Sequence, residues 1–312
     1  MRRGGCILKA ASTRATHPAA AAVKRKWPLS HYVFNVVNYV LLACVALAAV
    51  IPFLYILAGS LTPAADMNKA GFTLIPSRFT LEAYSYLLSS EAVLRGLGVS
   101  VYITVVGTLV NIVFTVLMAY ALARKDLKGR QPIMLMVIFS MLFSGGMIPT
   151  FLIVKAMGLL DSYWSLMIPG AINAFNLIVM KNFFQQLPEG LEESAKIDGC
   201  NDLGILVRIV VPLSLPAIVT FVMFYAVGHW NSYFTAILYI NDNEKWPLQV
   251  LVRQLIILSQ GGLGEGNQDS FNIPAQTVNM AMIVLSTLPI LLVYPFLQKH
   301  FAKGVLLGSV KG

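Results

Sequence analysis

The sequence is poor in charged residues, and this scarcity excludes most soluble proteins. Asp, Glu, Lys and Arg make up 12% of the 312 residues, whereas hydrophobic residues make up 57%. Soluble globular domains carry roughly twice that charged fraction. The formal net charge of +9 does not indicate a nucleic-acid-binding protein, because the basic residues do not gather on one stripe with interleaved aromatic residues. We therefore expect a membrane protein.

Cysteine and histidine are also scarce, and neither residue type forms a recognisable site. The three cysteines, Cys6, Cys44 and Cys200, lie far apart, without the spacing of a disulfide framework or a metal site. The four histidines are scattered, and no G-x-x-x-x-G-K-[ST] phosphate loop occurs. Hydrolytic Ser/His/Asp patterns and zinc-ligand patterns are missing too. The sequence predicts no catalytic residue, no metal site and no cofactor in this chain, so any ATP would bind to another polypeptide.

Long apolar segments account for most of the chain. Six of them are close to or above the length that crosses about 30 Å of hydrocarbon, and they predict an all-α membrane protein with six transmembrane helices. A shorter apolar run, Leu248–Leu258, contains Gln249, Arg253 and Gln254 and predicts a surface or re-entrant helix. The six predicted spans are Val33–Leu57, Leu97–Ala123, Ile133–Val154, Tyr163–Met180, Leu213–Ile240 and Thr277–Leu297.

The basic residues orient these spans. Of the Lys and Arg residues outside them, 17 fall on the side of the two termini and 6 on the other side, so the positive-inside rule places both termini in the cytoplasm. Residues 1–31 are basic and predict a disordered cytoplasmic tail; a mitochondrial presequence is the alternative for such an acid-free start. Residues 32–298 would form the membrane domain, and residues 299–312 a short cytoplasmic tail.

The longest polar interruption between two apolar spans covers residues 187–216. Glu192 and Glu193 sit in the early turns of a predicted short helix, where carboxylates complement the positive helix end, and Glu192 precedes Lys196 by four residues. Gly199 predicts a left-handed C-cap. An interfacial anchor would be rich in Lys and Arg, so this acidic helix favours docking against another protein.

A second short helix is predicted directly after this turn. Asn201 suits its N-cap position, and Pro212 and Pro216 mark the return to the next apolar span. Residues 187–216 therefore predict an exposed helix-turn-helix held between two membrane segments.

The same stretch resembles the EAA loop of permease subunits in binding-protein-dependent ABC importers, especially those for sugars and oligosaccharides. Glu193-Ser194-Ala195 stands at the EAA position, Asp198-Gly199 at the Asp-Gly pair, and Ile209-x-Val211-Pro212 at the closing I-x-L-P. Ser194 replaces an alanine of the pattern and Val211 replaces a leucine. The resemblance continues through Gly145–Pro149, Trp230-Asn231 and Trp246–Gln249.

The resemblance implies a type I ABC importer permease fold in a prokaryotic plasma membrane and movement of a sugar or oligosaccharide by alternating access. It implies four kinds of partner contact: a second permease in a heterodimer, two ATPase subunits that bind ATP and Mg, an extracytoplasmic solute-binding protein, and lipid. A non-sugar solute stays open, as do a membrane scaffold and a stand-alone secondary transporter. The residues that would couple to the ATPase are Glu192, Glu193, Ser194, Ala195, Asp198, Gly199, Ile209 and Pro212.

Polar residues within the spans are candidates for a solute path, because such residues usually face a bundle interior or a water-filled cavity. His229, Trp230, Asn231 and Tyr233 combine rings and hydrogen-bonding groups, as a sugar site requires. Asn173 and Asn176 in the fourth span are secondary candidates. Alternatively, Trp230 and Tyr233 belong to an interfacial aromatic belt, and His229 and Asn231 bond between helices. The glycines at 145 and 146 predict a break in the third span.

Overall fold

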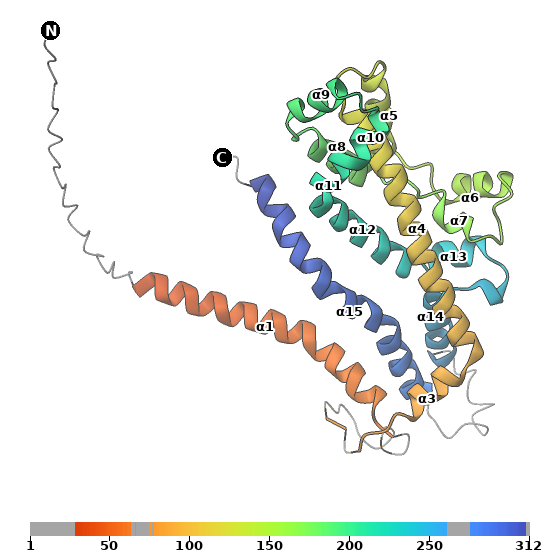
Figure 1. The fold of residues 1–312 in the computed structure, drawn as a ribbon. Helices are drawn as coiled ribbons and strands as arrows, with labels where there is room; N and C mark the ends of the chain where they lie inside the picture. The colour runs from red at the N-terminus through yellow and green to blue at the C-terminus, as the bar shows by residue number, and fades with distance from the viewer. Residues whose placement is uncertain (1–28, 64–65, 67–74, 77, 261–274, 310–312) are drawn as a thin grey trace, which may run out of the picture. The chain divides into compact units, whose positions relative to one another are not determined.

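The computed structural model describes residues 29–63, 66, 75–76, 78–260 and 275–309. All regular structure in this part of the chain is helical (Figure 1), which confirms the predicted all-α class. The chain divides into two compact units, residues 1–51 and 52–312. Most of the predicted N-terminal tail, residues 1–28, lies outside the described residues.

Helix α1, Leu29–Ser60, is apolar along its whole length, and its membrane-spanning portion is Tyr32–Ser60. None of its most apolar 18-residue window is buried against the rest of the chain. A helix that is hydrophobic all round is stable only inside a membrane or a large core. The first predicted span is thus confirmed as one long apolar helix.

The second unit is built around α4, Glu91–Ala123, which matches the second predicted span. Small and polar residues on α4, such as Gly107 and Asn111, are buried where other helices approach closely. Helices α8, α12 and α14 pack against α4, and α15 packs against α12 and α14 (Figure 1). The bounds of these partners are Ala174–Phe184 for α8, Leu215–Trp230 for α12, Leu248–Gln260 for α14 and Ala275–Ser309 for α15.

Three of the six predicted spans are not single continuous helices, because these apolar segments are broken. In the described residues, three helices are long and apolar enough to cross a membrane, or four if the bent pair Asp202–Leu213 and Leu215–Trp230 counts as one span. That pair is bent by 86°. The third segment divides into α5, Arg130–Leu142, and α6, Met147–Ala156; the fourth into α7, Trp164–Met167, and α8; and the fifth into α12 and α13, Phe234–Tyr239.

The break in the third segment lies where the glycine pair predicted it. Gly146 adopts φ +86°, a conformation that a β-carbon strongly disfavours, and it precedes the first residue of α6. The break in the fourth segment surrounds Pro169 and Gly170. Breaks of this kind occur at membrane depth only where the freed backbone is buried or lines a cavity.

Two features near the C-terminal end bear on the predictions. The helix predicted over Leu248–Leu258 exists as α14, and Leu248 and Val250 at its start are fully buried, which favours the re-entrant alternative over the surface one. Helix α15 continues to Ser309, so it runs through most of the predicted C-terminal segment, residues 299–312. The short helix α3, Glu82–Ser89, buries Ala83 and Leu87 against α15 and α4.

Candidate functional site: a docking loop and a polar cavity

The predicted helix-turn-helix is present. Helix α9, Glu189–Ile197, ends where Gly199 adopts φ +81°. The Cys200 N–H donates to the Ala195 carbonyl at 2.9 Å, and the Gly199 N–H donates to the Lys196 carbonyl at 3.0 Å. These bonds satisfy carbonyls that the end of a helix otherwise leaves without donors. The left-handed C-cap is therefore confirmed.

The second short helix, α10, spans Asp202–Ile205, and its predicted N-cap is also confirmed. The Asn201 Oδ1 accepts a hydrogen bond from the Gly204 N–H at 2.8 Å. The helix continues as a π-helical turn, Leu206–Val210, and then as α11, Val211–Leu213. Pro212 has no N–H to donate, which disturbs the regular ladder at this point. Residues 187–216, called the docking loop below, thus run continuously through the bend into α12.

The predicted coupling residues differ in what they contact. Ala195 is buried in a core cluster that includes Ile205, and Ile209 packs against the same cluster. The Ser194 hydroxyl donates to the Gly190 carbonyl at 2.8 Å, so it belongs to α9 itself. Glu193 and Asp198 are exposed and Glu192 is half-buried. The buried residues hold the turn in place, and the exposed ones are free to meet a partner.

A charged groove lies beside α9. Its lining includes Glu192, Glu193 and Lys196 of α9, and Arg124, Lys125 and Asp126 of the segment after α4. The groove has a volume of about 240 Å³. Arg124 pairs with Asp126 at 3.0 Å and with Asp202, although Asp202 is 78 residues away in sequence. The hydrogen bond that the Arg124 guanidinium donates to Asp126 lowers the pKa of the Asp126 carboxyl. The sequence analysis missed this ion-pair network, which ties the segment after α4 to α10.

The docking loop also exposes apolar side chains. Ile197 at the end of α9 is 86% exposed, and Leu203 and Val207 are exposed further along the loop. Large exposed apolar side chains beside a charged groove are typical of a protein interface.

A polar cavity of about 660 Å³ lies further along the second unit, between α4, α8 and α12. Five of the six predicted path residues line it: Asn173, Asn176, His229, Asn231 and Tyr233. Polar residues that the sequence analysis did not single out for the path also line it, among them Asn111, Tyr225, Ser232 and Thr235. The break before α8 and the break after α12 both open onto this cavity, as expected for irregular backbone at membrane depth.

Two hydrogen-bond networks fix the walls of this cavity. The Asn111 Nδ2 donates to the Gly170 carbonyl at 2.7 Å, and its Oδ1 lies 3.0 Å from the His229 Nε2. The Tyr225 hydroxyl lies 2.8 Å from the Thr115 Oγ1 and accepts from the Asn173 N–H at 3.2 Å. His229 thus has the interhelical bond that the alternative interpretation expected, and it also borders the cavity.

Asn173 and Asn176 lie at the start of α8. The Asn173 Oδ1 accepts from the Asn176 N–H at 3.1 Å, which makes Asn173 the N-cap. Asn176 is only 7% exposed. In the described part of the chain its side-chain amide makes no hydrogen bond, although the residue borders the cavity.

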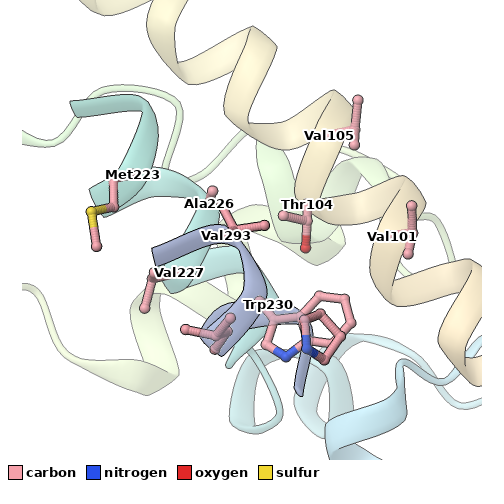
Figure 2. Close-up of a pocket in the computed structure, with 10 residues that line it drawn as sticks. Val101, Thr104, Val105, Met223, Ala226, Val227, Trp230 and Val293 are labelled. Carbon is pink, nitrogen blue, oxygen red and sulfur yellow. The ribbon is translucent and has the colours of Figure 1, made fainter. Parts of the chain in front are cut away.

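Trp230 is the one predicted path residue that the structure places elsewhere. It is 5% exposed, and its Nε1–H donates to the Ser286 carbonyl of α15 at 2.9 Å. Its ring borders a separate apolar cavity of about 180 Å³ between α4, α12 and α15 (Figure 2). One residue along a helix turns a side chain by about 100°, so Trp230 faces away from the cavity that His229 borders. Burial also contradicts an interfacial belt position for Trp230.

Tyr233 remains at the polar cavity and is partly exposed. The guanidinium carbon of Arg253 lies 5.0 Å from the centre of its ring, within the range of a cation–π contact. The cavity therefore combines an aromatic ring, several amides and hydroxyls, and a nearby cation.

Comparison with known proteins places these features in context. Residues 112–307 match the family model described as "Binding-protein-dependent transport system inner membrane component". The chain is 56% identical over 286 residues to the polygalacturonan/rhamnogalacturonan transport system permease protein YtcP of Bacillus subtilis (strain 168), covering 91% of this chain and all of that protein. It is 57% identical over 281 residues to the protein LplC of the same organism, covering 90% and 95% of the two chains.

A solved structure is similar as well. A chain in the crystal structure of a bacterial ABC transporter involved in import of the acidic polysaccharide alginate superposes with a TM-score of 0.83 and 35% sequence identity, covering 88% of this chain and 99% of that chain. The similarity extends far beyond the docking loop and includes the helices that form the polar cavity.

Proposed function

Because the chain belongs to the family of binding-protein-dependent transport system inner membrane components, we propose that it is the permease subunit of an ATP-driven importer whose solute is a saccharide. The observation that carries this proposal is the polar cavity, which gathers five of the predicted path residues on broken helices. Its volume, about 660 Å³, falls within the range of small-molecule sites. The named substrates of the relatives, polygalacturonan, rhamnogalacturonan and alginate, support a saccharide.

The cavity has the chemistry that a saccharide requires. Amides and hydroxyls from Asn173, Asn176, Asn231 and Ser232 can exchange hydrogen bonds with sugar hydroxyls, and the Tyr233 ring can stack on an apolar sugar face. None of the residues that line the cavity is an Asp, Glu, Lys or Arg. A secondary transporter coupled to an ion gradient would require such ionisable residues at its coupling site, so the lining favours an ATP-driven mechanism.

We place the ATPase contact on the docking loop, residues 187–216. The groove beside Glu192 and Glu193 offers carboxylates to a basic group of the partner, and the exposed Ile197 offers an apolar anchor. ATP and Mg would bind entirely within the partner ATPase. The remaining partners are a second permease, a second ATPase subunit and an extracytoplasmic binding protein, with the docking loop on the cytoplasmic face of the plasma membrane.

The fold connects the docking loop to the cavity, so a movement that the ATPase imposes on α9 can be transmitted to α12. Movement of α9 would pass through α10, the π-helical turn and α11 to the 86° bend before α12. Helix α12 carries His229, whose bond to Asn111 reaches α4 at the cavity wall. Alternating access then consists of rigid-body rocking of these helices about the cavity.

The proposal is tested by reconstituting the chain with its companion permease, ATPase and binding protein in liposomes. We expect the ATPase to co-purify and labelled saccharide to accumulate only with ATP and the loaded binding protein. Accumulation that follows an imposed ion gradient without ATP would contradict the proposal, and so would a complex that forms without an ATPase.

A further inference from the structure

Helix α8 begins inside the polar cavity, and its start is held rigidly. The segment before it is fixed by the bond from Asn111 to the Gly170 carbonyl and by the bond from the Asn173 N–H to Tyr225. The first N–H groups of a helix have no partner within the helix. Asn173 accepts from the N–H groups of Asn176 and Leu177, which leaves those of the two preceding residues to a ligand. This end of α8 also carries the positive pole of the helix dipole.

The Asn176 side chain is a second and independent sign of a ligand. It is more than nine-tenths buried, yet in the described residues its amide makes no hydrogen bond. The Asn176 amide atoms are not among the fully enclosed side-chain atoms that lack a partner, so the amide is reachable from the cavity. Asn176 borders the cavity, so a bound molecule there could accept from the Asn176 amide.

The charges around the cavity favour an anion. The lining contains no acidic residue, and the exposed Arg253 lies over the Tyr233 ring. The negative pole of α12 faces the same cavity, but two of its last carbonyls, those of Val227 and His229, already accept from the N–H groups of Asn231 and Ser232 at 3.1 Å each. No carboxylate among the lining residues therefore opposes an anion at the positive end of α8.

We propose that the N-terminal end of α8 and the Asn176 amide bind a carboxylate of an acidic saccharide, so that the transported solute is a uronate-containing oligosaccharide. The carboxylate oxygens accept from the first N–H groups of α8 and from the Asn176 Nδ2. Discontinuous helices of transporters direct their positive ends at anionic groups in the same way. This inference rests on the proposed saccharide function and names the substrate class for the same cavity.

The test compares trigalacturonate with its trimethyl ester, which has the same sugar backbone but no charge and three added methyl groups. Equilibrium binding is measured on the complete transporter in phosphatidylcholine nanodiscs without the binding protein, so that neither an anionic lipid nor the binding protein selects the ligand. Asn176→Asp places a carboxylate in the first turn of α8, where it suits the helix dipole but repels a bound anion. The matched control is Asn182→Asp on the same helix, outside the cavity.

We expect wild type to bind trigalacturonate more tightly than the ester. Asn176→Asp should raise the Kd for trigalacturonate at least about tenfold and the Kd for the ester less than about twofold, and Asn182→Asp should change neither. If Asn176→Asp does not assemble, Asn176→Leu removes the amide without adding charge and should weaken trigalacturonate binding by about threefold or more, and binding of the ester by less.

Equal binding of the two probes by wild type, or equal loss of both in Asn176→Asp, would overturn the carboxylate site while leaving saccharide transport intact. Phosphatidylglycerol that competes with trigalacturonate in wild type but not in Asn176→Asp would assign the site to a lipid headgroup instead. Failure of the proposed function itself would appear separately, as loss of ATP-driven uptake of every saccharide tested.

Discussion

His229 Nε2 lies 3.0 Å from Asn111 Oδ1, and this bond joins α12 to α4 at the wall of the polar cavity. The contact depends on Gly107, because a β-carbon at that position would lie 2.6 Å from the same ring nitrogen. The docking loop leads directly into α12, so under the proposed mechanism a movement of the loop would reach the cavity at this bond.

Gly107→Ala is expected to displace the His229 ring and break its bond to Asn111. Overpacking of a close helix contact costs about 1–3 kcal/mol, so the melting temperature of the purified complex should fall and uptake should drop. Gly98→Ala on the same helix is the matched control, because nothing lies within 4 Å of its added β-carbon. A Gly107→Ala complex that melts and transports like Gly98→Ala would show that the His229 position does not matter.

Gly199→Val should uncouple the ATPase without preventing membrane insertion. The φ of +81° at Gly199 costs a side chain about 1–2 kcal/mol, with an added penalty for β-branching. Gly190→Val, inside α9 and with open space around its added β-carbon, controls for a valine on the same loop. Solute-stimulated ATPase activity and co-purification of the ATPase should both fall in Gly199→Val. Both should stay higher in Gly190→Val than in Gly199→Val. Full stimulation in Gly199→Val would remove the coupling role from this turn.

Glu193→Lys should weaken ATPase docking by reversing the charge at the groove. Truncating one partner of a buried interfacial charge pair costs about 2–5 kcal/mol, enough to reduce co-purification strongly at moderate salt. Glu82→Lys on α3 has the same charge change on an exposed residue that does not line the groove, and it should reduce docking less. Equal effects of the two substitutions would indicate a general charge effect rather than a specific contact.

Two substitutions should distinguish the structural role of one ring from the solute-binding role of the other: Trp230→Phe and Tyr233→Ala. Trp230→Phe removes the hydrogen bond to the Ser286 carbonyl, so it should lower stability by about 1 kcal/mol and leave saccharide affinity within about twofold. Tyr233→Ala removes a ring at the cavity and should weaken affinity about threefold to tenfold, with little loss of stability. The opposite pattern in melting and binding assays would show that the two rings have been assigned the wrong roles.

Features set by local backbone chemistry were predictable from the sequence. Gly199, Asn201 and Gly146 each occupy a conformation or cap that few other residue types suit, so their neighbours in sequence were enough to predict the turns. The break before α8 also had a local signal, the Pro169-Gly170 pair, but the continuous apolar run from Tyr163 hid it.

Features set by long-range packing were not predictable. Arg124 and Asp202 are 78 residues apart, and no local pattern pairs them. The direction of Trp230 was missed because α12 is apolar on nearly all sides, so its periodicity does not distinguish the cavity face from the opposite face. The continuity of the predicted spans was misjudged for a related reason, since apolar composition does not show where a helix breaks.

The most direct test of this account places a photoreactive amino acid at Ser232 in the cavity or at Ile197 on α9 during active transport. We predict that Ser232 captures labelled saccharide only when ATP and the loaded binding protein are present, and that Ile197 captures the ATPase and no saccharide. Capture of saccharide at Ile197, or steady transport without capture at Ser232, would contradict the division between a solute cavity and a docking loop.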